Sequence, residues 1–304
     1  MKKRLIVSLL ILLSLLFFSC KQVERPKEKE EDSGVKWAGI RVSSYGMKES
    51  YGEDNFPNVS KMMGFAESME SKYGGSTGAY IWIVGTVSEK DWTCNLEFPL
   101  SKEIDKVRGR NWDKAESYLA ACDKAGYSVW LQVEPGDADL VALATEVMAH
   151  YMNHPCVKGF GIDVEWYKPA GTDGEGTPLS SEVANKVLKA VRDINPNYTV
   201  FVKHWDEEWL PEAKEGFIYV NDSQGFWDGK GMTALERMRE EFSSWAETFA
   251  PCPVMFQIGY RADRSIWKSF KDPAKELGQY LADGCNSGND VGIIWVDFTL
   301  SQVL

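Results

Sequence analysis

The stretch Gly159-Phe160-Gly161-Ile162-Asp163-Val164-Glu165-Trp166-Tyr167 decides the fold, because it reads as one strand with two different faces. Side chains alternate along a strand, so Phe160, Ile162 and Val164 share one face. The other face carries two glycines and then the carboxyls of Asp163 and Glu165. An apolar outer face with an inner face of small residues ending in acids is typical of a strand in a parallel α/β barrel.

The rest of the chain repeats the same unit. Eight apolar, strand-like runs are expected at 37–44, 79–85, 127–134, 157–165, 198–205, 216–221, 253–259 and 291–297. Helical patterns are expected at about 59–73, 110–125, 137–152, 180–194, 233–249 and 272–283. Alternation at this spacing predicts an α/β fold, a (β/α)8 TIM barrel. An open doubly wound sheet is the alternative, but no glycine-rich phosphate loop follows the first run.

Two segments depart from the repeat. The segment 86–106 is long and irregular, which predicts a loop over the barrel mouth. The chain ends seven residues after Asp297, so the last helix of the barrel is expected to be incomplete.

The N-terminus predicts a targeting segment. Lys2, Lys3 and Arg4 precede an apolar run that ends at Phe18, followed by Ser19 and Cys20. This pattern indicates a signal peptide over residues 1–19, and a cysteine directly after Ser19 resembles the lipobox of bacterial lipoproteins, in which Cys20 is acylated. An ordinary signal peptide and an uncleaved anchor are the alternatives, although the run is short for a membrane span. Residues 20–36 are highly charged and predict a flexible tether, and residues 37–304 form the barrel domain.

The composition limits the partners. Without residues 1–19 the chain has 285 residues and a formal charge of −14, because three cations leave with the signal. This acidic balance excludes nucleic acid as the expected partner and leaves the lipid as the only link to a membrane. The expected location is therefore the cell envelope, with the protein lipid-anchored, at the outer membrane or cell surface, and monomeric. The five cysteines after Cys20 match no zinc spacing, and no function or pairing is assigned to them.

Polar and aromatic side chains recur at the predicted strand ends, which is where barrel active sites assemble. The expected binding residues are Glu134, Trp166, Lys203, His204, Asp206, Tyr219, Asn221, Asp222, Gln257, Tyr260, Trp295 and Asp297. Sugar rings stack on aromatic faces, so Trp166, Trp205 and Trp295 are candidate platforms, with Trp295 expected on the barrel floor. These residues predict a glycan as the substrate or ligand.

Asp163 and Glu165 are the candidate catalytic pair. Paired acids at such a strand end are suited to acid and base chemistry on a glycosidic bond. Glu165 is expected to be the general acid, with a raised pKa, and Asp163 to orient the reacting group or stabilise developing positive charge. The structural alternative is a salt-bridge network with Lys203 and Arg41, but the glycines beside the pair are expected to leave open space. Glu134 is either a third acid or a hydroxyl-binding group.

Three segments carry a resemblance to a known family. Gly161-Ile162-Asp163-Val164-Glu165-Trp166-Tyr167 resembles the end of the fourth-strand signature of glycoside hydrolase family 18, the chitinase-like barrels, whose pattern is D-G-x-D-x-D-x-E. Tyr219-Val220-Asn221-Asp222 is similar to the family's tyrosine–aspartate pair, which holds the acetamido group of the substrate. Gly292-Ile293-Ile294-Trp295 is similar to the run with its floor tryptophan. Gly161 replaces one acid of the series. The resemblance implies a glycosidase in which Glu165 is the acid.

Two alternatives of other classes remain. The first is a non-catalytic carbohydrate-binding lipoprotein with the same barrel. The second is a metal-dependent barrel that uses Glu134, Glu165, His204 and Asp206, whereas His150 and His154 fall at the opposite end of the fourth strand. No cofactor and no metal are expected on the favoured interpretation.

Overall fold

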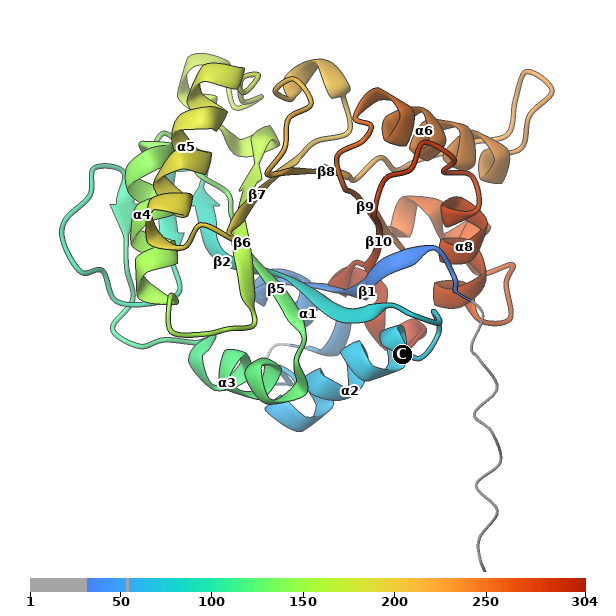
Figure 1. Cartoon of the computed structure of the whole chain (residues 1–304), viewed down its shortest axis with the longest axis horizontal. Coiled ribbons are helices and arrows are strands. Elements are labelled where there is room, and N and C mark those ends of the chain that lie inside the picture. Colours follow the sequence, from blue (N-terminus) through green and yellow to red (C-terminus); the bar gives the residue numbers. More distant parts are fainter. Residues whose placement is uncertain (1–31, 53–54) are drawn as a thin grey trace, which may run out of the picture. The chain divides into compact units, whose positions relative to one another are not determined.

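The computed structural model describes residues 32–52 and 55–304, and within them eight parallel strands close into a barrel (Figure 1). The barrel strands are β1 (Val35–Val42), β2 (Thr77–Ser88), β5 (Ser128–Val133), β6 (Val157–Asp163), β7 (Thr199–Lys203), β8 (Phe217–Asn221), β9 (Val254–Ile258) and β10 (Val291–Trp295). Closure comes from the parallel pairing of β1 with both β10 and β2. The chain is therefore a (β/α)8 TIM barrel, as the sequence predicts.

Helices cover the outside of the ring (Figure 1). They are α1 (Ser44–Tyr51), α2 (Val59–Glu70), α3 (Glu116–Ala125), α4 (Leu140–His150), α5 (Ser181–Ile194), α6 (Ala234–Thr248), α7 (Arg264–Trp267) and α8 (Pro273–Ala282). Local sequence sets several starts, since Ser180 caps α5 and Thr233 forms a reciprocal capping box with Glu236 at α6. All six helices expected from the pattern are present.

The connections differ from a regular repeat at two places. Between β7 and β8 there is only the short 3₁₀ turn η3 (Glu207–Trp209), and after β10 the 3₁₀ segment η5 (Asp297–Gln302) replaces the eighth helix. The expectation of an incomplete last helix is confirmed. The irregular segment after β2 contains an ordered hairpin, because β3 (Thr93–Leu96) pairs antiparallel with β2 and parallel with β4 (Val107–Arg108).

The alternation of side chains separates two apolar regions. The larger core lies between the strands and the helices and includes Phe160, Ile162 and Val164. The second lies inside the barrel and consists of strand residues only: Ala79, Ile81, Trp130, Phe201, Ile218, Val220, Met255 and Ile294. Polar side chains follow these apolar residues toward the C-terminal strand ends, and this order places a polar site above an apolar plug.

The boundaries near the N-terminus follow from β1. This strand begins at Val35, two residues before the expected start at Trp37. The predicted signal peptide, Cys20 and most of the predicted tether lie outside the described residues. Within the described part, no helix has the length and apolar character needed to cross a membrane.

Candidate functional site

The barrel mouth contains a pocket of about 300 Å³. Seven residues predicted from the sequence line it: Glu134, Asp163, Glu165, Trp166, Lys203, Asp222 and Tyr260. They come from the ends of five barrel strands or the turns that follow them, and the parallel arrangement brings them together. The structure therefore brings these seven predicted residues together at the mouth.

Lys203 organises the acids at the base of the pocket. Its ammonium lies 3.1 Å from Oδ1 of Asp163 and hydrogen-bonds to Oδ2 of Asp222. The register of β6 and β7 places Asp163 directly beside Lys203, which explains the pair. Burial alone would lower the pKa of Lys203, but the two carboxylates raise it well above its usual value. The ammonium therefore stays charged and holds Asp163 in a fixed position.

Asp163 has a second anchor in the amide of Gln132, whose Nε2 donates to Oδ2 over 2.9 Å. Burial raises the pKa of Asp163 to about 7; Lys203 opposes the rise, and the charges of Glu165 and Asp222 add to it. The Asp163 carboxyl is thus held by two contacts, and it is protonated at a higher pH than an ordinary aspartic acid.

Glu165 differs from Asp163 in its contacts. It belongs to the 3₁₀ turn η1 (Val164–Trp166), so it stands above the strand end and not on the strand itself. Within residues 32–52 and 55–304, no group hydrogen-bonds or forms an ion pair with its carboxyl, which faces the pocket. Burial raises its pKa, Lys203 opposes this, and Asp222 and Glu134 raise it further. A half-buried carboxyl with a raised pKa and no internal partner is available to a ligand.

Glu134 is a third acid on the wall, and it is held by protein donors. The Tyr45 hydroxyl donates to Oε1 over 3.0 Å, and the backbone amide of Val87 donates to Oε2 over 2.9 Å. Burial and the charge of Asp163 raise its pKa to about 7. Glu134 is therefore a fixed group, in contrast to Glu165.

Arg41 does not join the Asp163–Glu165 pair. Its guanidinium donates to Oδ1 of Asp297, while the backbone amide and hydroxyl of Ser43 both donate to Oδ2 over 2.6 Å. The ring of Phe298 lies 4.5 Å from the guanidinium carbon. Asp297 is fully buried by these contacts and joins the ends of β1 and β10, so it supports the pocket from below.

Buried polar atoms without a hydrogen-bond partner gather at this end. Within the described residues they include Oε1 of Gln132, Oδ1 of Asp222 and Nε2 of Gln257, while Oδ1 of Asp163 has the ion pair with Lys203 but no hydrogen bond. The carbonyl oxygen of Gln257 is satisfied by the Tyr260 hydroxyl over 3.0 Å. Buried polar groups are nearly always paired, so a concentration of unpaired ones indicates a place for water or a polar ligand.

A second hollow of about 360 Å³ adjoins the pocket and is bounded by Glu165, Asp222 and Trp205. Trp205 is 48 % exposed, and its indole stacks on the ring of His204 at 4.1 Å. Trp209 stacks on the other face of His204 at 4.4 Å. Burial lowers the pKa of His204 to about 4, and its Nδ1 accepts from the amide of Asp206. The neutral imidazole of His204 therefore packs against the exposed indole of Trp205 and holds it in place.

Two predicted binding residues of β8, Tyr219 and Asn221, face away from the mouth. Tyr219 lies in the outer core, where its ring stacks on Phe249 at 3.9 Å and its hydroxyl donates to the carbonyl of Glu212. Asn221 donates to Glu241 of α6. The inward positions of β8 are occupied by Ile218 and Val220, and the alternation turns Tyr219 outward.

Trp295 is also outside the pocket, which corrects its expected place on the barrel floor. Its side chain has no exposed surface, lies edge-on to Trp267 at 5.8 Å, and donates through Nε1 to Thr299. The inward residue of that strand is Ile294. Asp206 also does not line the mouth pocket. Its carboxyl caps the short turn η3.

The two glycines before the acids do not create open space. A β-carbon on Gly161 would lie 2.1 Å from the ring of Phe201, and one on Gly159 would lie 2.1 Å from the carbonyl oxygen of Thr199. Gly161 therefore makes room for an aromatic ring in the barrel interior. The expectation that the glycines leave a void beside the acids is wrong.

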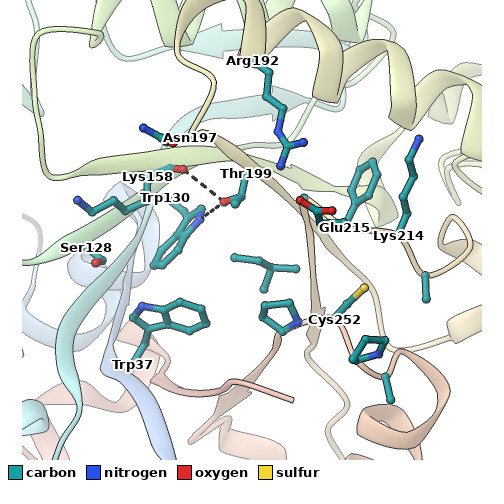
Figure 2. A pocket seen from close by; sticks show the side chains of 17 residues that line it. Trp37, Ser128, Trp130, Lys158, Arg192, Asn197, Thr199, Lys214, Glu215 and Cys252 are labelled. Atoms are coloured by element: carbon teal, nitrogen blue, oxygen red, sulfur yellow. Dashed lines mark hydrogen bonds between the residues drawn. The ribbon is translucent and has the colours of Figure 1, made fainter. Parts of the chain in front are cut away.

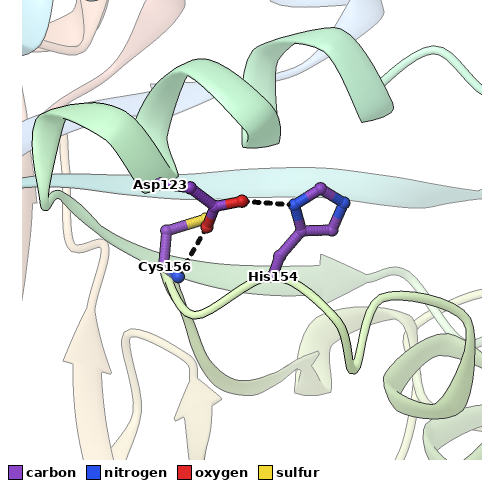
Figure 3. A group of neighbouring side chains, drawn as sticks. All are labelled: Asp123, His154 and Cys156. Carbon is purple, nitrogen blue, oxygen red and sulfur yellow. Dashed lines mark hydrogen bonds and ion pairs between the residues drawn. The ribbon is translucent and has the colours of Figure 1, made fainter.

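The metal alternative does not assemble at the mouth. In the described part of the chain, the one group of ligand-type atoms within 4.8 Å of each other is Asp123, His154 and Cys156, at the other end of β6 (Figure 3). His154 contacts Asp123 at 2.7 Å through Nδ1 and Glu116 at 3.2 Å through Nε2, while the Cys156 thiol faces the carbonyl of Leu119. These internal contacts make the group a structural link between α3 and the start of β6.

Several pocket residues were not identified from the sequence as binding residues. They are Tyr45, Val87, Glu89, Gln224 and Phe298. Tyr45 lies at the start of α1, immediately after the first strand, and such a position after a barrel strand was a usable signal. Val87 lies near the end of β2 and Phe298 in η5, whereas Glu89 and Gln224 lie outside the helices and strands, where the sequence pattern offered no periodicity.

Comparisons with known proteins give distant matches only. No family model matches the chain, and no curated protein matches it. Among solved structures, a β-glucuronidase from an uncultured Clostridium species is 15 % identical, with a TM-score of 0.39 over 62 % of this chain and 37 % of that one. A Bacteroides uniformis β-glucuronidase 2 bound covalently to cyclophellitol-6-carboxylate aziridine is 13 % identical, with a TM-score of 0.48 over 86 % and 30 %.

An endo-glycoceramidase II from a Rhodococcus species is 11 % identical, with a TM-score of 0.45 over 90 % of this chain and 76 % of that one. The chain spans about a third of the length of the first of these structures. The chain is thus distantly similar in structure to glycoside hydrolase barrels. Likeness at this level carries no argument about activity, which has to come from the site.

Proposed function

We propose that this chain is a glycoside hydrolase that acts on a glycan by general acid catalysis from Glu165, with Asp163 as its partner. The observation that carries the proposal is the contrast within the pair. Asp163 is anchored by Lys203 and Gln132, whereas Glu165 faces the pocket without an internal partner. A raised pKa keeps the Glu165 carboxyl protonated at higher pH than usual, as a general acid requires.

In this mechanism Glu165 donates its proton to the glycosidic oxygen as the bond to the sugar breaks. The anomeric carbon then carries developing positive charge. Asp163, fixed below, stabilises that charge or orients the group that attacks the carbon. Water finally supplies the hydroxyl that bonds to the anomeric carbon and gives its proton to a carboxylate of the site, which completes the hydrolysis. Tyr260 lines the pocket, and its hydroxyl, which donates to Oε1 of Gln257, is suited to accept a hydrogen bond from a sugar hydroxyl.

Trp205 replaces Trp295 as the proposed sugar platform. Its indole is half exposed, it borders the hollow next to Glu165, and the stack on His204 and Trp209 holds it in place. Trp166 lines the central pocket and is the second aromatic wall. A sugar chain that crosses Glu165 would extend over Trp205.

The test is Glu165→Gln, assayed by release of reducing ends from chito-oligosaccharides and from a panel of other oligosaccharides. Turnover should fall by about 10²-fold or more while binding persists, since the amide keeps the shape and loses the proton. Glu175→Gln, at an exposed position after the 3₁₀ turn η2 (Pro169–Gly171), is the matched control and should keep full turnover. Equal turnover in the Glu165 variant and the wild type would refute the role of Glu165.

The second candidate is a non-catalytic carbohydrate-binding lipoprotein. The observation that favours it is the Lys203 ion pair, which holds Asp163 as a structural salt bridge would. Here the wild type would bind oligosaccharides and release no reducing ends, and Glu165→Gln would change affinity alone.

We also propose that Cys20 is acylated and anchors the protein at the cell envelope. The support is the basic, apolar and small-residue order of residues 1–20. Cys20→Ser should abolish labelling by a fatty-acid probe and release the protein from the membrane fraction. Unchanged membrane fractionation of the variant would contradict the proposal.

A further inference from the structure

The opposite, N-terminal end of the barrel contains a cavity of about 620 Å³, roughly twice the volume of the mouth pocket (Figure 2). It lies below the apolar plug of the barrel, between the starts of β5, β7, β8 and β9. Small-molecule sites are typically concave, apolar spaces of about 300–1,000 Å³ with a few polar groups. This cavity has that size and, as the lining shows, that composition.

The walls are mainly aromatic and aliphatic. The indoles of Trp37 and Trp130 meet edge to face at 5.2 Å. Nε1 of Trp130 donates to the Thr199 hydroxyl over 2.9 Å, which leaves the rest of the ring as apolar surface. Ile218 and Pro253 line other parts of the cavity. The apolar part of a ligand would pack against these side chains.

Arg192 of α5 is the cation that faces this space. Figure 2 shows its guanidinium directed into the cavity. Its Nε donates to the carbonyl of Tyr198 over 3.2 Å, and it forms no ion pair with any carboxylate in the described residues. Gly216 lies beneath it with φ +96°, and a β-carbon there would be 2.7 Å from the guanidinium. Because Gly216 has no side chain, the guanidinium of Arg192 has room to lie at this position.

The other charged groups at the rim do not cancel this cation. The ammonium groups of Lys158 and Lys214 hydrogen-bond to the carbonyl of Pro155 and to Asn185. Glu215 also lines the cavity and forms no ion pair among the described residues. Three cations against one anion give the cavity a positive balance.

We propose that this cavity binds a small amphipathic anion, with an apolar body against Trp37 and Trp130 and a single carboxylate on Arg192. The apolar walls favour the body by burial of its surface, and the guanidinium offers two N–H donors in the planar geometry that matches a carboxylate. This site is separate from the mouth, and it stands or falls independently of the glycosidase proposal.

The experiment is calorimetric titration of the purified full chain with sodium octanoate and, as the neutral probe of equal length, octan-1-ol. Octanoate should bind with saturation at one site, more tightly than octanol. Arg192→Gln should lower the affinity for octanoate by about tenfold or more, because a hydrogen bond to a charged group is lost. The affinity for octanol should stay unchanged. Arg192→Lys should restore part of the octanoate affinity. Trp37→Ala should weaken both probes.

The matched control is Lys189→Gln, which removes a cation from an exposed position on the same helix. It should bind both probes like the wild type, and thermal melting verifies that each variant is folded. The proposal is overturned by a lack of saturable octanoate binding, by equal affinity for octanol, or by unchanged octanoate affinity in Arg192→Gln.

Discussion

The two ends of the barrel interior are built on different principles. The mouth is lined by carboxyls around two buried cations, with several polar atoms left unpaired. The N-terminal end is lined mainly by indoles and aliphatic side chains, with the guanidinium of Arg192 directed into the cavity and the other charges at the rim. The same eight strands form both ends, so the difference lies in which residues occupy the inward positions at the start and at the end of each strand.

The two ends of the barrel therefore contribute to stability in different ways, one through apolar packing and the other through buried charges. Inward residues such as Trp130, Phe201 and Ile218 contribute packing that does not depend on protonation. At the mouth, burial raises the pKa of acids that the chain keeps close together. The stability contributed by the mouth therefore depends on pH, and that contributed by the plug does not.

The strongest test of the packed end is Trp130→Ala. Removal of a buried indole should lower the free energy of unfolding by about 3–5 kcal/mol, by the same amount at pH 5 and pH 8. Urea unfolding at both pH values measures it. Trp112→Ala, at an exposed indole, is the control and should cost little. A loss that changes strongly with pH would break the comparison.

At the mouth, Lys203→Met should lower the free energy of unfolding near neutral pH by as much as Trp130→Ala does. Asp163 and Asp222 would lose their shared cation, and breaking a buried pair in this way costs about 3–5 kcal/mol. The cost should shrink toward pH 5, because burial raises the pKa of Asp163 and its protonation removes an uncompensated charge. Urea unfolding of Lys203→Met and of the exposed control Lys186→Met tests this; a pH-independent cost would contradict the mechanism.

Glu134→Gln tests the linkage directly. Burial raises the pKa of Glu134 from 4.5 to about 7, so the folded state binds the proton more tightly than the unfolded chain does. This group therefore stabilises the fold fully below pH 4.5, and that contribution is lost as the pH rises through 7. The shift corresponds to about 3 kcal/mol.

The glutamine can still accept from Val87 and donate to Tyr45, so the variant should stay folded. Its melting temperature should decline less than that of the wild type between pH 5 and pH 8. Glu182→Gln, on an exposed helix, should leave the wild-type slope unchanged. Identical slopes for Glu134→Gln and the wild type would count against the raised pKa.

The smallest expected effect concerns the aromatic platform. Trp205→Ala should weaken oligosaccharide binding by about 1–3 kcal/mol, the range for stacking on an exposed ring, with little loss of stability. Trp295→Ala should do the reverse, because its indole belongs to the outer core, where removal costs about 3–5 kcal/mol. Affinity and melting temperature measured on both variants decide between the two tryptophans.

The sequence by itself determined the barrel and identified seven of the residues that line its mouth. Strand and helix periods are local properties, and each of the eight runs from Trp37 to Asp297 carried its own signal. The parity of Asp163 in its strand was also local, and the parallel arrangement then placed it at the mouth with Lys203 and Asp222. No contact between distant residues was needed for these inferences.

Only the tertiary structure decided which groups are paired and which faces are inside. Arg41 binds Asp297, 256 residues away in sequence, and this left Lys203 to hold Asp163. Trp295 and Tyr219 lie on the outer face because Ile294 and Val220 fill the inward positions. Gly161 accommodates a ring from the next strand. These outcomes depend on register and packing between strands, and a single strand's pattern does not contain them.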